Sequence, residues 1–282
     1  MKYAYRLQNV FAFPGQKLTG NPLCVFEDGS GLTDLQMQAL ALQFNLSETT
    51  FILPAVHTTA HMRIFTPASE LPFAGHPTLG TAHTVRSLKG AGDHVTLAMQ
   101  AGAIPVQAHG DHWTLQANAP VTREFDTTRL DELAAALGLT REDFAADPLW
   151  VSTGMEQLLV PIASKEAVRR IQPGAGLAAF SAASGNKVSV YTFSPLAETE
   201  MLVRFFFNKN AGSMGEDPAT GSACANLGGY VVATGRTLPL HRTLHQGEYV
   251  GRPSLLKLTV DADKRIFVSG EVIELGRGYV EI

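Results

Sequence analysis

The chain has 282 residues, of which 45% are hydrophobic and 17% are charged, and its formal net charge is −4. This composition is typical of a globular protein with a large core, and the length suits two domains of about 140 residues. No stretch rich in Lys and Arg stands out, which argues against a nucleic-acid or membrane partner. The sequence contains no signal-type segment and no apolar run near ~18 residues, so a cytoplasmic protein is expected.

Two cysteines, Cys24 and Cys224, lie far apart and match neither a CxxC pair nor the spacing of zinc ligands. This usage fits a reducing compartment, with one long-range disulfide as the alternative. The segment HGDH at 109–112 could suggest metal ligands, but a polar hairpin turn is the favoured interpretation. We therefore expect no metal site.

Taken in chain order, the hydrophobic pattern predicts a mixture of strands and helices. Alternating or β-branched runs predict strands near 3–7, 23–27, 49–53, 61–65, 95–99, 104–108, 113–117, 150–153, 158–162, 188–193, 201–207 and from 255 onward. Helices are expected after Thr33, which can form a capping box with Gln36, and over 77–88, 128–137, 141–145, 167–171, 177–183 and 218–234. The predicted fold class is therefore α+β.

An internal repeat is the most informative feature of the chain. Residues 63–82 (RIFTPASELPFAGHPTLGTA) align without gaps to residues 204–223 (RFFFNKNAGSMGEDPATGSA) at an offset of 141. The alignment pairs several residues with identical ones: Arg63, Phe65, Pro77, Gly80 and Ala82. So long a period excludes a solenoid and implies two similar domains, each with a strand that leads to a helix begun by proline.

The division between these domains is expected after residue 117. The stretch at 118–126 (NAPVTREFD) is the best candidate for a boundary, and the last strand is expected to return to the first domain. The predicted domains are therefore 1–117 together with 273–282, and 118–272.

A titratable residue precedes the proline in each repeat, His76 in the first and Asp217 in the second. The simplest interpretation is structural, with Asp217 as a helix cap and Pro218 in the first helical position. The functional interpretation uses the free N–H groups and partial positive charge of a helix start, which suit a carboxylate or phosphate and could stabilise an enolate-like state. Ser222 would lie nearby, and duplicated domains commonly place their site at the interface.

Proton transfer at such a site needs a base, for which Glu48 is the candidate. It stands in an otherwise uncharged stretch between a predicted helix and a strand, and a buried Glu could exchange protons near neutral pH. A solvated loop carboxylate is the alternative. The repeat partner of Glu48 is Ser189, so only one such base is expected, and Glu216 is interpreted as a solvated residue at the rim.

Four segments resemble the PhzF family of phenazine-biosynthesis-like isomerases: NLSETTF (45–51), LPFAGHPTLGTAH (71–83), GEDPATGSA (215–223) and HQGEYVGRPS (245–254). Their order and spacing cover nearly the whole chain. The resemblance implies a diaminopimelate epimerase-like fold: two similar domains, each a curled antiparallel sheet around a central helix, with the site between them. It also implies a proton shift next to a carboxylate that needs no metal or organic cofactor.

By the same resemblance, the acid/base residue falls on Glu48, and the supporting residues fall on His76, Asp217 and Ser222. Backbone N–H groups at the two helix starts would hold the substrate carboxylate. The predicted substrate-binding residues are therefore Gly75, Pro77, Thr220 and Gly221. The epimerase and racemase relatives use a cysteine at each helix start, which this chain lacks.

The predicted function is a cofactor-independent isomerase that shifts a proton next to the carboxylate of a small organic acid, with Glu48 as the single acid/base. The alternatives are an amino-acid racemase or epimerase, and a non-catalytic protein that binds small carboxylates. The expected partners are the substrate and a second copy of the chain in a homodimer, with no nucleic acid and no membrane.

Overall fold

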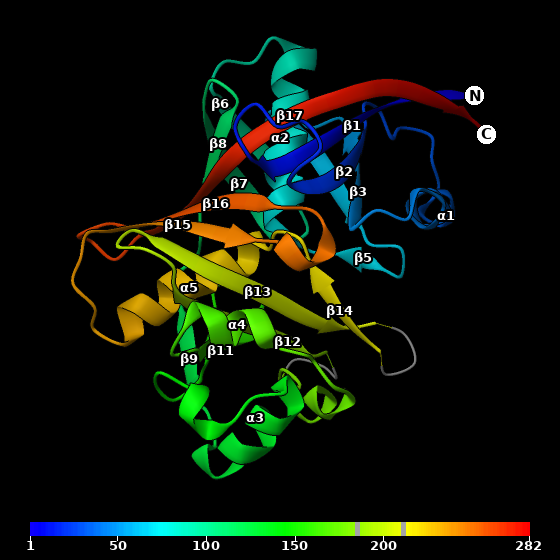
Figure 1. The fold of residues 1–282 in the computed structure, drawn as a ribbon. Coiled ribbons are helices and arrows are strands. Elements are labelled where there is room, and N and C mark those ends of the chain that lie inside the picture. The colour runs from blue at the N-terminus through cyan, green and yellow to red at the C-terminus, as the bar shows by residue number, and fades with distance from the viewer. Residues whose placement is uncertain (184–186, 210–212) are drawn as a thin grey trace. The chain divides into compact units, whose positions relative to one another are not determined.

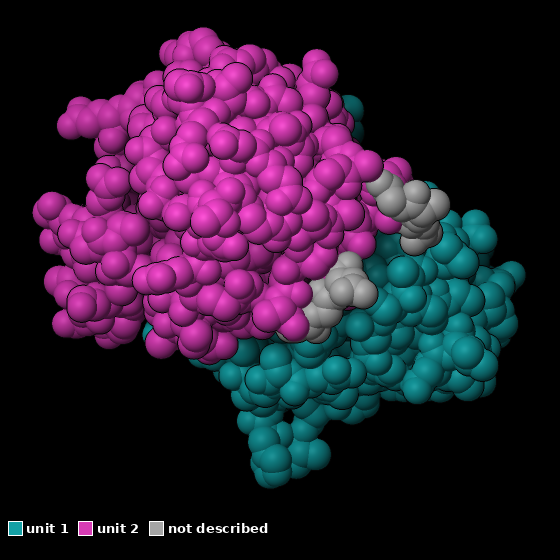
Figure 2. Space-filling model, turned by 90° about the horizontal axis from the view of Figure 1, so that it is seen from below, with its two compact units in different colours: residues 1–116, 269–282 teal, residues 117–268 magenta. Residues whose placement is uncertain are grey.

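A computed structural model describes residues 1–183, 187–209 and 213–282 of the chain. The contacts divide it into two compact units, Met1–Gln116 with Ser269–Ile282, and Ala117–Val268 (Figure 2). Both units are rich in strands, and each contains one helix of 13 or 15 residues, so the fold has mixed α/β content.

The first unit is built from strands that surround one long helix. Its elements are β1 (Lys2–Ala12), β2 (Asn21–Phe26), α1 (Asp34–Phe44), β3 (Glu48–Leu53), β4 (Ala60–Phe65), β5 (Glu70–Leu71), α2 (Gly75–Lys89), β6 (His94–Met99), β7 (Gly102–His109), β8 (His112–Gln116) and most of β17 (Ile266–Glu281). Neighbouring strands pair antiparallel, except for the parallel pairs β2–β3 and β4–β6. Helix α2 packs against β1, β2, β3, β6 and β8 (Figure 1).

Local sequence explains how the elements of this unit begin and end. The Thr33 and Gln36 capping box starts α1 as predicted, and the helix ends at Asn45 in the left-handed conformation. Phe26 and Phe51 stack with ring centroids 4.8 Å apart in the core beneath α1. Gly80 lets α2 approach the sheet, because a Cβ there would lie 2.5 Å from Leu23 Cδ2.

The second unit has strands around a comparable helix, with smaller helices outside. Its elements are β9 (Val121–Glu124), α3 (Leu130–Leu137), β10 (Leu149–Ser152), β11 (Glu156–Pro161), α4 (Lys165–Arg170), β12 (Ser189–Pro195), β13 (Glu200–Asn208), β14 (Met214–Asp217), α5 (Gly221–Ala233), β15 (Leu240–Gln246), β16 (Ser254–Val260) and the start of β17, with 3-10 turns at Thr127–Arg129, Arg141–Asp143, Ala175–Ala179 and Glu248–Val250. The parallel pairs are β11–β12 and β13–β15. Helix α5 packs against β9, β10, β11 and β16.

Two hairpins, one in each unit, share the same register. In the pair β3–β4, Thr49 lies opposite Phe65, and in the pair β12–β13, Val190 lies opposite Phe206. Both partners are displaced by 141 residues, which is the offset of the sequence repeat. Beyond this hairpin the ungapped alignment is wrong, because Phe65 next pairs with Glu70 whereas Phe206 pairs with Glu216. The second connection is longer by five residues, so the offset becomes 146.

The corrected alignment matches ELPFAGHP (70–77) with EDPATGSA (216–223). It pairs Gly75 with Gly221, the first residue of each long helix, and His76 with Ser222. The expectation that Asp217 caps the second helix is therefore wrong, since Asp217 ends β14 and Thr220 occupies the cap position of α5. Pro218 lies outside the helix, because strand pairing with β13 continues through Asp217.

Candidate active site

Glu48 and His76 lie close together in the first unit. Glu48 is the first residue of β3, His76 is the second residue of α2, and Glu48 Oε2 lies 3.3 Å from His76 Nε2. Their side chains are 16% and 5% exposed. Burial lowers the pKa of His76 to about 3, and a hydrogen bond to the Pro22 backbone offsets this only in part. The ring is therefore neutral at physiological pH.

The other side of the His76 ring faces the start of β2. The amide nitrogen Nδ2 of buried Asn21 lies 3.4 Å from His76 Nδ1. A neutral imidazole carries one N–H donor and one acceptor nitrogen. The Asn21 amide can donate and the Pro22 carbonyl can accept, so these surroundings can satisfy either tautomer of the ring.

The first turn of α2 adds backbone donors beside this pair. Ala74 in the cap position has no capping side chain, and Pro77, the third helical residue, has no N–H. The turn therefore offers the N–H groups of Gly75 and His76 with the partial positive charge of a helix start. Such groups favour a bound carboxylate.

In the second unit, Asp217 and Thr220 are held together ahead of α5. Thr220 Oγ1 donates to Asp217 Oδ2 over 2.5 Å. Buried Gln246 fixes this turn, because its Nε2 donates to the Asp217 carbonyl (2.9 Å) and to Thr220 Oγ1 (3.0 Å). Its Oε1 accepts from the Thr220 N–H over 3.3 Å.

Ser222 is the second residue of α5, and its hydroxyl oxygen accepts a hydrogen bond from Gln157 Nε2 over 2.9 Å. Buried Tyr191 lies in the same region, where burial raises the pKa of its hydroxyl and the charge of Asp217 adds to the effect. The predicted residues Asp217, Thr220, Gly221 and Ser222 thus lie together in one short segment.

Glu216 has a defined structural role, which corrects its interpretation as a solvated rim residue. It forms a two-bond ion pair with Arg204, with Nε–Oε1 and Nη2–Oε2 distances of 3.1 and 2.7 Å, and its side chain is 10% exposed. The pair recurs in the first unit, where Arg63 binds Glu70 through the same atoms over 2.8 Å each. Each pair anchors the short strand that leads to a long helix.

The residues that sequence reasoning missed are amides on strands: Asn21, Gln157 and Gln246. Each is buried, although amide side chains are usually exposed, and each contacts a predicted site residue or its neighbour. Gln246 lies in the HQGEYVGRPS segment, which carried the family resemblance but no role. The signal in the sequence that could have indicated these residues is a polar amide within a predicted apolar strand.

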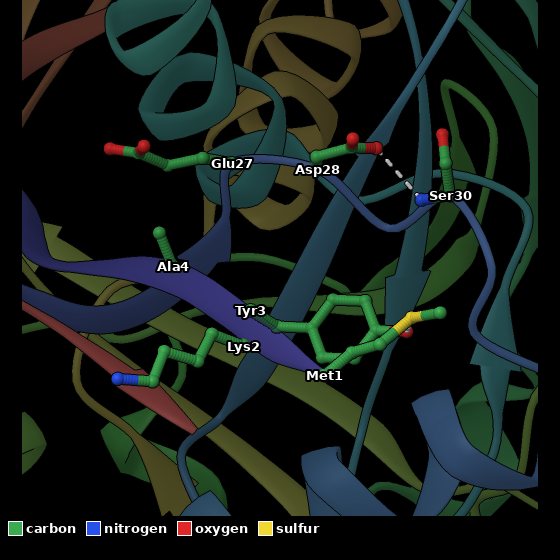
Figure 3. Close-up of a pocket in the computed structure, with 7 residues that line it drawn as sticks. All are labelled: Met1, Lys2, Tyr3, Ala4, Glu27, Asp28 and Ser30. Atoms are coloured by element: carbon green, nitrogen blue, oxygen red, sulfur yellow. Dashed lines mark hydrogen bonds between the residues drawn. The ribbon is translucent and has the colours of Figure 1, made fainter. Parts of the chain in front are cut away.

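Several other features lie apart from these clusters. A pocket of about 470 Å³ in the first unit is lined by Met1, Lys2, Tyr3, Ala4, Glu27, Asp28 and Ser30 and contains no predicted site residue (Figure 3). Within the described residues, no group of three His, Cys, Asp or Glu side chains is arranged to hold a metal ion. The described helices include none with the length and apolar character needed to span a membrane.

Comparison with known proteins places the chain in a family. The family model described as "Phenazine biosynthesis-like protein" (PhzC-PhzF) matches residues 10–277. A Pasteurella multocida protein named an uncharacterized isomerase is 38% identical over 98% of this chain and 93% of its own. The trans-2,3-dihydro-3-hydroxyanthranilate isomerase of Pseudomonas chlororaphis is 32% identical over 95% and 96% of the two chains.

The fold is similar to that of a solved structure in the same family. The phenazine biosynthesis protein of the PhzF family from Bacillus anthracis superposes with a TM-score of 0.85 over 100% of both chains, at 24% identity. The match to the family model spans most of the sequence, and curated relatives similar to it are named isomerases. The chain therefore belongs to the PhzF family of phenazine biosynthesis-like proteins and is an isomerase.

Proposed function

We propose that this isomerase shifts a proton next to the carboxylate of a small organic acid, with Glu48 as its single acid/base and without a cofactor. The observation that carries the proposal is the approach of Glu48 Oε2 to within 3.3 Å of Nε2 of a histidine that burial keeps neutral. A carboxylate in such a largely buried position is suited to act as a base and then as an acid.

In the proposed reaction, the Glu48 carboxylate removes a proton from a carbon of the substrate and becomes a carboxylic acid. The electron pair of the broken C–H bond moves into an allylic or enolate-like system. Glu48 then returns the proton to a different carbon, so that a double bond changes position and Glu48 is again a carboxylate. Atoms and charge balance without an oxidant, a reductant or a second base.

His76 can serve both forms of Glu48. A neutral ring can donate from Nε2–H to the carboxylate or accept at Nε2 from the carboxylic acid. Asn21 and Pro22 supply a donor and an acceptor on the ring's other side, which allows the tautomer to follow the protonation of Glu48. Gly75 and Pro77 belong to the proposed binding segment, where backbone N–H groups of the first turn stabilise negative charge on the substrate.

Asp217 and Ser222 are proposed as supporting residues for the same reaction, with Thr220 and Gly221 as substrate-binding residues. Their shared segment at the start of α5 offers hydroxyl and backbone donors that suit a carboxylate. We further propose that the two units are similar domains, each with a curled sheet around its long helix. The shared hairpin register and the recurring Arg–Glu pair support that relationship.

The thiols support a mechanism based on glutamate over two-thiol racemisation. Cys24 and Cys224 are free and buried, and burial raises the pKa of both well above the usual range. Because the thiolate is the reactive form, such thiols are poor bases. Cys224 is also the fourth residue of α5, beyond the first two backbone donors.

The test is a nuclear magnetic resonance assay in deuterium oxide. The probe acid is trans-2,3-dihydro-3-hydroxyanthranilate, the substrate in the name of the Pseudomonas relatives, followed by a set of small unsaturated and 2-amino carboxylic acids. The proposal predicts a shifted double bond. Solvent deuterium should appear at the new C–H position in those turnovers in which the Glu48 carboxylic acid exchanges its proton with the solvent before returning it. Inversion at a single carbon would instead identify a racemase, and binding with neither isomerisation nor exchange would identify a non-catalytic binder. Light scattering of the pure protein tests the proposed homodimer.

A further inference from the structure

Four polar side chains of the second unit form one continuous buried chain of hydrogen bonds. The Thr153 N–H and hydroxyl both donate to Asn226 Oδ1, over 2.7 and 2.8 Å. Asn226 Nδ2 donates to Gln157 Oε1 over 2.8 Å, and Gln157 Nε2 donates to Ser222 Oγ over 2.9 Å. Asn226 and Gln157 have no exposed surface. The chain thus connects β11 to the second residue of α5.

The direction of every bond in this chain is fixed from one end. A backbone N–H can only donate, so the atom of Asn226 that faces Thr153 must be its oxygen. The amide nitrogen of Asn226 then points to the Met155 carbonyl (2.9 Å) and to Gln157, which must present its own oxygen. The amide nitrogen of Gln157 is therefore the group that faces Ser222.

This direction decides what Ser222 can do. A hydroxyl has one proton, and Ser222 Oγ already accepts from Gln157, so its own O–H must point away from Gln157. Ser222 is therefore available as a hydrogen-bond donor. A donor fixed in this way can stabilise an anion without reorienting during the reaction.

The first unit has a comparable arrangement around a different side chain. Under the corrected alignment His76 takes the place of Ser222, and Asn21 at the start of β2 reaches it with an amide nitrogen, as Gln157 on β11 reaches Ser222. In both units, a strand amide thus contacts the second residue of the long helix. The recurrence favours a role for the amides in orienting these residues.

We propose that Gln157, oriented by Asn226, is a positioning residue that makes Ser222 an obligate hydrogen-bond donor to the anionic group of the substrate. The inference rests on the proposed function and deepens it, because it assigns the Ser222 O–H a hydrogen bond to the carboxylate of the substrate or to an oxyanion that develops during the reaction. Gln157 itself does not touch the substrate.

The substitution Gln157→Glu tests the direction of these hydrogen bonds while preserving the shape of the side chain. When it is protonated, the introduced carboxyl group can still donate a hydrogen bond to Ser222 Oγ. In its ionised form it can only accept a hydrogen bond from the Ser222 O–H, which is then no longer available to the substrate. Burial raises the pKa of a carboxyl group, so the change occurs within an accessible pH range. Relative to wild type, we expect near-normal kcat/KM at low pH and a loss of roughly tenfold to a hundredfold as pH rises.

Two readouts separate positioning from simple stabilisation. Because burial raises the folded-state pKa of the introduced carboxyl group, thermal stability of the variant should match wild type at low pH and fall as pH rises through that pKa. In a Ser222→Ala background, Gln157→Glu should cause little further loss of kcat/KM. Gln172→Glu, on an exposed side chain of the same unit, is the matched control and should follow the wild-type pH profile.

The outcomes distinguish this inference from the proposed function. If wild type isomerises no acid of the set, the proposed function is wrong, and calorimetric binding of the probe acid or benzoate then replaces kcat/KM as the readout. Affinity that falls with pH in Gln157→Glu alone supports the inference. A pH profile parallel to wild type, or an additive loss in the double variant, overturns it.

Discussion

Glu48 and His76 meet at 3.3 Å although 28 positions separate them, because the first residue of β3 and the second residue of α2 lie at the same end of one unit. Neither residue has a strong local signal in the sequence. Their approach joins the acid/base candidate to a ring that burial keeps neutral.

His76 should make the protein sensitive to acid. Its folded-state pKa is about 3 against an ordinary value of 6.5, so the unfolded chain binds a proton that the folded chain does not. Stability from this source is complete above pH 6.5 and falls as pH drops toward 3. The free energy of unfolding should change with pH by up to about 1.4 kcal/mol per pH unit in this range.

Urea unfolding at several pH values should show a smaller change of this free energy with pH for His76→Gln than for wild type. Exposed His57→Gln is the control, and equal slopes for all three would contradict the prediction.

The two Arg–Glu pairs should differ in their contribution to stability. Arg204 and Glu216 are 6% and 10% exposed, and Arg204 also donates to the carbonyls of Val168 and Ile171. Removing one partner leaves a buried charge without its counter-ion, so Glu216→Gln should destabilise by about 3 kcal/mol.

The equivalent change in the first unit is the matched control. Arg63 and Glu70 are 19% and 22% exposed, and Arg63 keeps Asp34 as a second partner. Glu70→Gln should therefore cost about 1 kcal/mol in urea unfolding. Equal losses for the two variants would show that burial does not set the contribution of these pairs.

Gln246 should keep the segment 217–220, ahead of α5, in a fixed conformation. Its counterpart in the first unit is Met99. The equivalent strand residues His61 and Leu202 pair with Ala98 and His245, and Met99 and Gln246 are the residues that follow these partners. Gln246→Met keeps the volume but leaves the Thr220 N–H and the Asp217 carbonyl without this partner, at about 1–3 kcal/mol for each group. Hydrogen exchange should become faster at Thr220 and in the first turn of α5. Unchanged protection there would show that Gln246 does not hold the turn.

Cys224 should be dispensable for the reaction. Cys224→Ala removes a buried thiol whose pKa burial raises, and we expect kcat/KM for the probe acid within about threefold of wild type, with a loss of stability of about 1 kcal/mol. A thiol reagent should label the native wild-type protein only on unfolding. A loss of exchange beyond about a hundredfold in a folded Cys224→Ala variant would favour a thiol mechanism.

Much of the fold could be predicted from the sequence because its signals are local. The capping box at Thr33 led to the correct α1, and the β-branched runs and the offset of 141 predicted strands that the structure pairs in hairpins of matching register. The helix starts were misplaced, because an Asp-Pro step resembles a cap and an insertion of five residues cannot be seen in an ungapped alignment. The true alignment is fixed by the pairing of Phe65 with Glu70 and of Phe206 with Glu216, which is known only from the folded sheet.

The candidate site was only partly predictable for the same reason. Glu48 and His76 were both selected, and the structure brings them together within one unit. The amides Asn21, Gln157 and Gln246 were missed, because a buried amide is recognisable only when its partners are known. Glu216 was interpreted as exposed, since its partner Arg204 lies twelve residues earlier across a strand pair.

The central claim is that Glu48 alone moves the proton, and its most direct test is deuterium exchange into the probe acid by Glu48→Gln. Glutamine keeps the shape and the contact with His76 but cannot accept a proton from carbon. We expect exchange and isomerisation to fall by about 10²–10⁴-fold while binding of the acid is retained, with exposed Glu281→Gln unchanged. Exchange at the wild-type rate in a folded Glu48→Gln protein would contradict the account.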